Sequence, residues 1–237
     1  MKIRIKFGKS GAMRFIGHLD IMRYFQKAIR RAGIDIAYSE GFSPHQIMSF
    51  AAPLGVGLES QGEYMDIEVV SADSAADIKE KLNKAMVPGM EILSVTKLSE
   101  DSKNAMASVA AARYIVRFRE GYEPDFDWKS QLGSFYERPS IMVIKKTKKS
   151  EIEMDLKPSI FSLHIGEDRI GSFIEMLVDA SSSGNIKPSL VLEAFLKEHD
   201  KTLSEYALEI TRADTYTNTG SEESPVLVPL DAIESQF

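Results

Sequence analysis

The chain contains no cysteine among its 237 residues. Zinc sites with thiolate ligands, iron–sulfur clusters and cysteine nucleophiles all require that side chain, so this polypeptide alone supplies none of them. Histidine is also scarce, with four residues. No two of them stand four positions apart with a carboxylate partner, the spacing typical of a helical zinc motif. We therefore expect that this chain binds no metal and no cofactor of its own.

Long apolar runs are missing too. The sequence has no uninterrupted apolar stretch of the roughly 18 residues that a membrane-spanning helix needs. The first residues, MKIRIKFGK, alternate charged and apolar side chains and lack the apolar segment of a signal peptide. The hydrophobic content of 43% is enough for a substantial core. We therefore expect a cytoplasmic protein without a membrane partner.

Charge is distributed unevenly along the chain. The formal net charge is -6, yet residues 1–50 contain nine Lys or Arg against three Asp or Glu. General acidity discourages nonspecific binding of polyanions, whereas a local basic patch still attracts phosphate groups. The N-terminal part is therefore the candidate binding region, with the alternative that its charges only solvate a helix face.

Residues 18–32 are predicted to form an amphipathic helix. Its apolar positions, spaced three and four residues apart, are Leu19, Met22, Phe25, Ile29 and Ala32. Arg23, Lys27 and either Arg30 or Arg31 follow the same spacing on the opposite face. This pattern predicts a buried apolar stripe and an outward row of cations.

The segment SEGFSPH, residues 39–45, is rich in turn-forming residues. Gly41 and Pro44 are expected to shape the turn. Phe42 is interpreted as an anchor into the core, with a platform for a ligand as the alternative. Ser43 and His45 are expected to remain accessible.

The order of predicted elements indicates an α+β fold with two ferredoxin-like (βαββαβ-type) domains, the first with an inserted hairpin. In the first domain, residues 1–98, we predict strands at 3–7, 34–38, 46–51, 63–70 and 90–98 and helices at 18–32 and from 73. In the second, residues 110–213, we predict strands at 113–119, 141–146, 152–156, 159–165 and 206–212 and helices at 126–136 and from 188. Residues 170–179 fit either a strand or a helix. Residues 214–237 are expected to form a polar tail, either mobile or used in packing.

The residues KSGAMRFIGHLDIMRYFQKAIRRAGIDIAYSEGFSPHQIMSFAAPLGVGLESQGEYMDIEV resemble the amino-terminal signature of the radical SAM-linked protein family. The resemblance implies a partner, a radical SAM enzyme with a cobalamin-binding region to which such chains are fused or beside which they are encoded. S-adenosylmethionine, the iron–sulfur cluster and cobalamin would then all be bound by that partner.

A second, weaker similarity is to the RAMP superfamily of CRISPR-associated endoribonucleases. It depends on a basic helix opened by His18, the turn from Tyr38 to Gly41, and the strand at Ser49 and Phe50 that leads to Pro53. This similarity implies binding of RNA by paired ferredoxin-like domains.

Three functions follow. The first is an accessory module without catalysis of its own that holds a structured RNA for a radical SAM enzyme. Its candidate RNA-binding residues are Arg14, Arg23, Lys27, Arg30, Arg31, Ser43, His45, Lys145, Lys146, Lys148 and Lys149. The second is a metal-independent endoribonuclease in which His18 and His45 act as base and acid, because both groups can exchange protons near neutral pH. The third is a protein–protein adaptor that binds no RNA.

Overall fold

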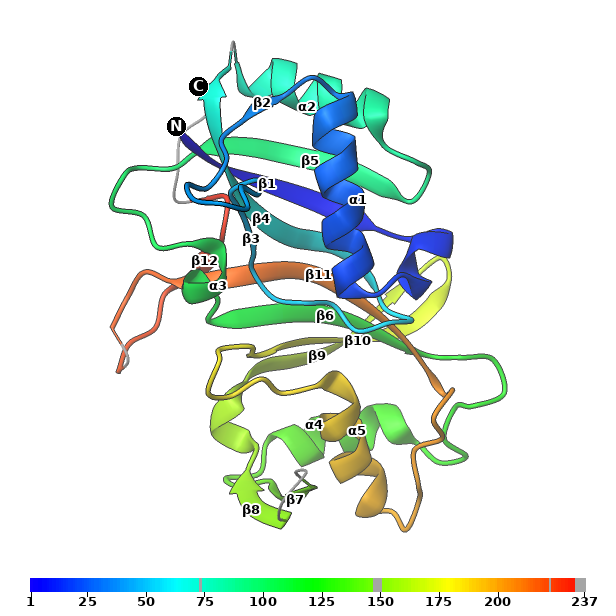
Figure 1. Cartoon of the computed structure of the whole chain (residues 1–237). Coiled ribbons are helices and arrows are strands. Elements are labelled where there is room, and N and C mark those ends of the chain that lie inside the picture. The colour runs from blue at the N-terminus through cyan, green and yellow to red at the C-terminus, as the bar shows by residue number, and fades with distance from the viewer. Residues whose placement is uncertain (73, 147–150, 222, 233–237) are drawn as a thin grey trace. The chain divides into compact units, whose positions relative to one another are not determined.

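Figure 1 shows the computed structural model of the chain, which describes residues 1–72, 74–146, 151–221 and 223–232. The chain divides into two units. The first combines Met1–Ala110 with Arg212–Phe237, and the second is Ala111–Thr211. Both units contain antiparallel strands together with helices, which confirms the predicted α+β class.

Five strands of the first unit follow the predicted order along the chain: β1 (Lys2–Lys9), β2 (Asp35–Ile36), β3 (Met48–Phe50), β4 (Glu59–Ser71) and β5 (Met90–Lys97). The unit also contains β11 (Leu208–Asn218) from Arg212 onward and β12 (Leu227–Pro229). Its helices are η1 (Gly11–Phe15), α1 (His18–Arg31), α2 (Ala75–Ala85) and α3 (Ala105–Ser108). β1 lies between β5 and β4, and β2 and β3 pair with β4, with every pairing antiparallel. Each long helix therefore connects two strands that have a third strand between them, an order compatible with a βαββαβ domain.

Alternation along β1 builds the core of this unit. Ile3, Ile5 and Phe7 are buried and pack in one cluster with Phe25 and Ile29 of α1. Phe7 and Phe25 meet edge to face, with ring centroids 4.7 Å apart. The helix thus covers the side of β1 on which every second residue is apolar.

The predicted apolar stripe of α1 needs one correction. Its buried residues are Ile21, Phe25, Ala28 and Ile29, whereas Leu19 is 62% exposed. At about 100° per residue, Leu19 lies about 160° around the helix from Ile21, so the two cannot face the same core. The stripe therefore begins at Ile21.

The segment from residue 214, expected to be a polar tail that is either mobile or used in packing, is packed and partly in strands where the structure describes it. β11 (Leu208–Asn218) continues well past the predicted end of the strand at 212, and β12 pairs with it. Leu230 is 0% exposed and packs with Ala51, Tyr64 and Ala105. The apolar run PVLVPL, residues 225–230, supplies the strand and the buried side chain, and the polar residues before it form the connection.

The elements of the second unit also follow the order predicted from the sequence. Its strands are β6 (Ala111–Phe118), β7 (Met142–Lys146), β8 (Glu151–Asp155), β9 (Ile160–Asp168), β10 (Gly171–Asp179) and the first residues of β11. Its helices are α4 (Trp128–Tyr136), η2 (Lys157–Ser159) and α5 (Pro188–Lys197). β10 lies between β6 and β9, antiparallel to both, so the segment predicted as either strand or helix at 170–179 is a strand from Gly171 to Asp179. β7 and β8 pair as a separate hairpin whose turn lies outside the described residues.

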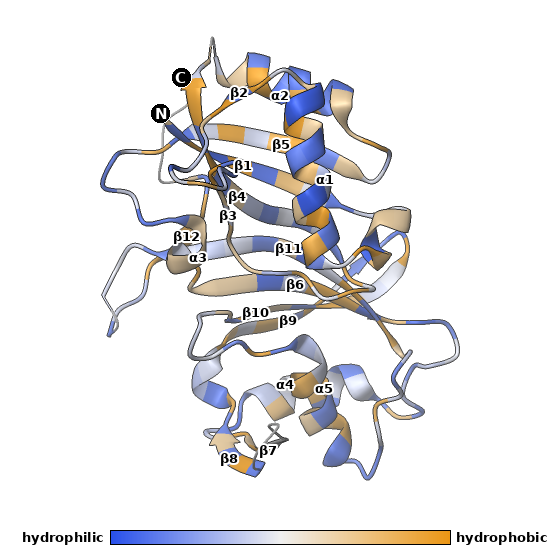
Figure 2. Ribbon diagram, in the orientation of Figure 1, coloured by the Kyte–Doolittle hydropathy of each residue, from blue (hydrophilic) through white to orange (hydrophobic). Residues whose placement is uncertain are grey.

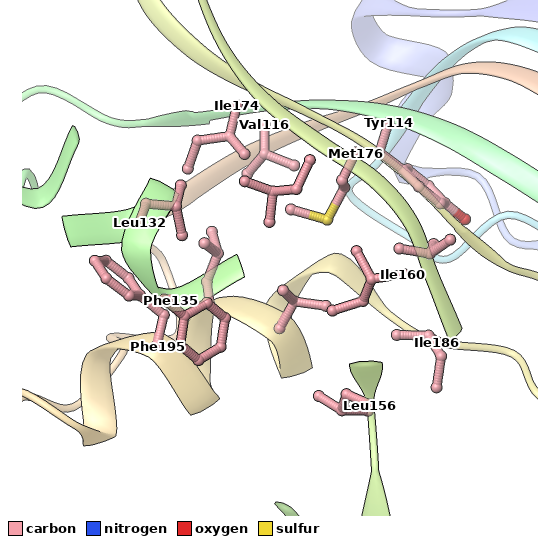
Figure 3. Close-up of a cluster of buried hydrophobic side chains, with 14 of the residues drawn as sticks. Tyr114, Val116, Leu132, Phe135, Leu156, Ile160, Ile174, Met176, Ile186 and Phe195 are labelled. Atoms are coloured by element: carbon pink, nitrogen blue, oxygen red, sulfur yellow. The ribbon is translucent and has the colours of Figure 1, made fainter. Parts of the chain in front are cut away.

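Figure 3 shows the core of the second unit, where side chains from sheet and helices point toward one another. Val116 of β6 and Met176 of β10 face Leu132 and Phe135 of α4, together with Phe195 of α5. All five are almost fully buried. Each unit thus has its own hydrophobic core. In the first unit, the face of α1 that points away from this core is exposed.

Candidate nucleic-acid interface

Three cations project outward from α1. Arg23, Lys27 and Arg30 are exposed, as the spacing predicts, and Figure 2 shows hydrophilic residues along much of this helix. The Arg23 side chain is 69% exposed and lies 3.3 Å from Asp20 in an exposed ion pair, a kind of contact that contributes little to stability. Within the described part of the chain, neither Lys27 nor Arg30 has an ion-pair partner. These three side chains are therefore available for phosphate groups.

The other two basic residues proposed in this region are engaged within the protein. Arg31 donates a hydrogen bond to the Ala85 carbonyl at 2.9 Å, at the end of α2. Arg14 lies 3.4 Å from Glu59 Oε1 and 4.9 Å from the centre of the Phe15 ring. Both contacts hold neighbouring segments in place, so Arg14 and Arg31 are less free to meet a ligand than the three outward cations.

The connection between β2 and β3 is closed by hydrogen bonds at its base. The Ser39 amide donates to the His45 carbonyl at 2.8 Å, and the Ser39 hydroxyl lies 2.8 Å from His45 Nδ1. Gln46 Nε2 donates to the Gln26 carbonyl of α1 at 3.3 Å. The base of this loop, residues 38–46, therefore contacts α1 at Gln46.

The tip of the loop contradicts one expectation. Phe42 is not an anchor in the core, because its relative exposure is 112%. The hydrogen bonds between Ser39 and His45 hold the base of the loop to the fold, so the residues between them project into solvent. Gly41 has a φ of 106°, a conformation that favours glycine, and allows the chain to turn there. Ser43 and His45 are exposed, as expected.

His18 and His45 are not brought together. The His18 ring packs edge to face on Phe50, with centroids 5.4 Å apart. His45 precedes Phe50 by five residues of largely extended chain, which spans about 16 Å at about 3.3 Å per residue. A general acid and a general base must both reach the reacting atoms, so this placement argues against the two histidines as the pair that RNA cleavage requires.

The surroundings of His18 are instead filled by protein contacts. A cavity of about 20 Å³ lies between His18, Lys9 and Glu63, large enough for about one water molecule. Lys9 Nζ donates to the Ile16 carbonyl at 2.9 Å, and burial lowers the pKa of this amine, with Glu63 opposing the shift. Glu63 is itself paired with Arg212 at 3.0 Å. Lys9, Glu63 and Arg212 are thus held by hydrogen bonds and an ion pair within the protein, as expected for residues with a structural role.

Sequence reasoning missed a buried charge pair on the opposite face of the first unit's sheet. Arg4 is 1% exposed, and its guanidinium meets the Asp66 carboxylate through Nε at 2.8 Å and Nη2 at 3.0 Å. It also donates to the Leu230 carbonyl at 3.1 Å and to the Lys103 carbonyl at 3.2 Å. Charged residues on the second side of β1 were the only available signal, because the partners are distant in sequence.

Tyr64 belongs to the same face. Its hydroxyl lies 2.7 Å from Asp214 Oδ1 and 3.0 Å from Asp231 Oδ1, and Lys6 Nζ lies 2.7 Å from Asp214 Oδ2. Burial, followed by the two carboxylates, raises the pKa of the Tyr64 phenol. Residues of the C-terminal segment thus pair with charged and polar side chains on this face of the sheet, and the exposed surface of α1 and the loop remains the candidate interface.

The remaining proposed cations fall outside what the structure describes. The side chains of Lys145 and Lys146 and all of Lys148 and Lys149 lie outside the described residues. Among the described residues, no three His, Asp or Glu side chains gather in a way that could hold a metal ion. No helix in the described ranges has the length and apolar character needed to cross a bilayer.

Comparison with known proteins gives a family and a distant likeness. A solved structure described as "Crystal Structure of a Cbf5-Nop10-Gar1 Complex" is similar to the chain, with 8% identity and a TM-score of 0.48. The match covers 90% of this chain and 48% of that one, so the chain spans about half of its length. No curated protein matches the sequence. The model of a family described as "Uncharacterized protein conserved in bacteria (DUF2344)" matches residues 2–188, and the chain therefore belongs to this family.

Proposed function

We propose that the chain is an RNA-recognition module that works with a radical SAM enzyme in the modification of RNA or a ribonucleoprotein. The observation that carries the proposal is the row of exposed cations Arg23, Lys27 and Arg30 beside a loop that exposes Phe42 and His45. The resemblance of residues 9–69 to the radical SAM-linked family supports the choice of partner.

The geometry of the cations suits a phosphate backbone. Arg23 and Lys27 are four residues apart and Lys27 and Arg30 three, so the row extends about 10 Å along the helix at about 1.5 Å per residue. Phosphate contacts by Lys and Arg supply most of the sequence-independent affinity of nucleic-acid-binding proteins. Because the whole chain is acidic, with a net charge of -6, phosphate contacts would form where exposed cations gather, as in this row.

The division of chemistry between the two proteins follows from the residues. This chain has no cysteine, and the clusters of radical SAM enzymes need thiolate ligands. The cluster, S-adenosylmethionine and cobalamin would therefore belong to the partner. The separation of His18 from His45 argues against the nuclease alternative, so the chain would hold the RNA while the partner modifies it.

The first test is binding of a fluorescein-labelled structured RNA, followed by anisotropy. Arg23→Ala combined with Lys27→Ala should weaken binding. Lys81→Ala combined with Lys84→Ala on α2 removes the same charge from pairs with Asp77 and Glu80, and this control should bind like wild type. Equal losses in both double variants would contradict a site on α1.

The same samples test the nuclease alternative on a denaturing gel. His18→Ala and His45→Ala should change the affinity modestly, and wild-type protein should leave the RNA intact. Cleavage by wild type that disappears in both histidine variants would favour the nuclease. Absence of both binding and cleavage would favour the adaptor.

A further inference from the structure

We propose that the loop binds unpaired RNA bases, with Phe42 and Tyr38 as stacking platforms beside the phosphate-binding cations. This inference depends on the proposed RNA-binding function and specifies its ligand as single-stranded RNA.

Phe42 has no structural task that explains its place. Its ring is fully exposed, although leaving an aromatic side chain in water forgoes the favourable free energy of burial. The loop that carries it is held at its base, where His45 N–H donates to the Ser39 hydroxyl at 3.1 Å in addition to the backbone bond. An apolar ring on an ordered loop is suited to stack on a flat ligand.

Tyr38 places a second ring on the helix side of the loop. Tyr38 and Gln46 face each other in an antiparallel bridge, and directly opposed residues project their side chains to the same side. The Gln46 side chain reaches the Gln26 carbonyl of α1, so the Tyr38 side chain leaves the loop toward α1 as well. Tyr38 is 49% exposed, which leaves part of its ring open to a ligand.

The cations lie on the same side of the helix as this contact. Arg23 precedes Gln26 by three residues and Arg30 follows it by four, so both are neighbours of Gln26 on the helix surface. The Tyr38 ring on the loop and two guanidinium groups on α1 therefore border one strip of surface, and Phe42 lies four residues beyond Tyr38 at the tip of the same loop. Proteins that bind single-stranded nucleic acid combine these two elements, a basic groove for the backbone and aromatic rings for the bases.

A double helix would not use the rings. In duplex RNA the bases are stacked on one another, and recognition depends on shape and on contacts to phosphates and 2′-hydroxyls. An exposed Phe42 ring can stack only on a base that is free of its neighbours, as in loops, bulges and single strands. The combination of rings and cations thus favours unpaired RNA.

The test compares one labelled single-stranded RNA of mixed sequence with the duplex that it forms with its complement. Phe42→Ala should weaken binding of the single strand by roughly 5- to 150-fold, the range found for loss of one stacked base. Binding of the duplex and the salt dependence of single-strand binding should not change. Phe42→Trp should bind like wild type, whereas Phe42→Leu, which keeps an apolar side chain without a ring, should bind like Phe42→Ala. Because Phe42 is exposed, thermal unfolding should be the same in all variants.

Failure of the inference is distinguishable from failure of the proposed function. If wild type binds RNA but neither prefers the single strand nor responds to Phe42→Ala, stacking is refuted and phosphate binding stands. Equal binding by Phe42→Leu and wild type would also refute stacking, because a ring would not be required. If wild type binds neither RNA, the RNA-binding function itself falls, and the inference with it.

Discussion

Removal of the Asp66 carboxylate should strongly destabilise the protein. Arg4 is 1% exposed, and Asp66 contacts two of its guanidinium nitrogens, at 2.8 and 3.0 Å. Asp66→Ala leaves that cation buried without an anion, a change that costs about 3–5 kcal/mol in proteins. The two carbonyls that Arg4 also contacts, of Leu230 and Lys103, compensate only in part, because they carry no full charge.

The assay is urea denaturation followed by far-UV circular dichroism, with the free energy of unfolding obtained by linear extrapolation. Glu68→Ala is the matched control, since Glu68 lies two residues further along β4, on the same side, and is half-buried. It should differ from wild type by about 0.5 kcal/mol or less. Arg4→Lys should also destabilise, because an ammonium group cannot reproduce the two-pronged contact. A loss under about 1 kcal/mol in Asp66→Ala, or one equal to that of Glu68→Ala, would refute the reasoning that this buried pair carries a large desolvation penalty.

Three further outcomes are expected. Leu230→Ala should lower the free energy of unfolding by about 2–5 kcal/mol, because the side chain is fully buried; an unchanged value would mean that the C-terminal segment is not packed. Gly62→Ala should be destabilising by about 1–3 kcal/mol, since an added Cβ would lie 2.3 Å from the Asp214 Cα. Gly133→Ala, at an open position in α4, should stabilise by about 0.5–1 kcal/mol. The pKa of the Tyr64 phenol is raised by burial, so the stability that wild type has over Tyr64→Phe should be fully present below about pH 10 and decline above it; a difference that grows with pH would have the wrong sign.

The regular elements could be predicted because local pattern determines them. β1 alternates apolar and charged residues, and the apolar positions of the pattern, Ile3, Ile5 and Phe7, are all buried. The turn residues Pro88 and Gly89 separate α2 from β5, and Gly89 has a φ of 89°. In such segments the side-chain period and the turn chemistry agree, so the sequence alone is sufficient.

Prediction from the sequence failed where contacts between residues distant in the chain determine the position of a side chain or segment. The residues SEGFSPH alone do not determine whether the Phe42 side chain is buried. The direction of the loop tip depends on hydrogen bonds at the base of the loop and on the contact of Gln46 with α1. The strands after residue 212 were not predicted, because a polar stretch precedes the short apolar run that ends at Leu230. The pairing of Arg4 with Asp66 joins residues 62 positions apart and leaves no periodic signal.

The candidate site likewise contains features that the local sequence pattern predicts and features that depend on the fold. The exposure of Arg23, Lys27 and Arg30 follows from helical spacing and could be predicted. The separation of His18 from His45 could not, because it depends on which residues of an extended segment face the start of α1. Spacing in sequence identified the cations, whereas the argument against a histidine pair needed the fold.

The salt dependence of RNA binding tests the central claim most directly. Each phosphate contact by a cation contributes about 0.7 to the slope of log affinity against log salt for single strands. If Arg23 and Lys27 each contact a phosphate, their double alanine variant should show a slope shallower than that of wild type by about 1.4. The Lys81→Ala, Lys84→Ala control should keep the wild-type slope. A slope that is the same in wild type and in the Arg23→Ala, Lys27→Ala variant would contradict the account that α1 is the RNA-binding surface.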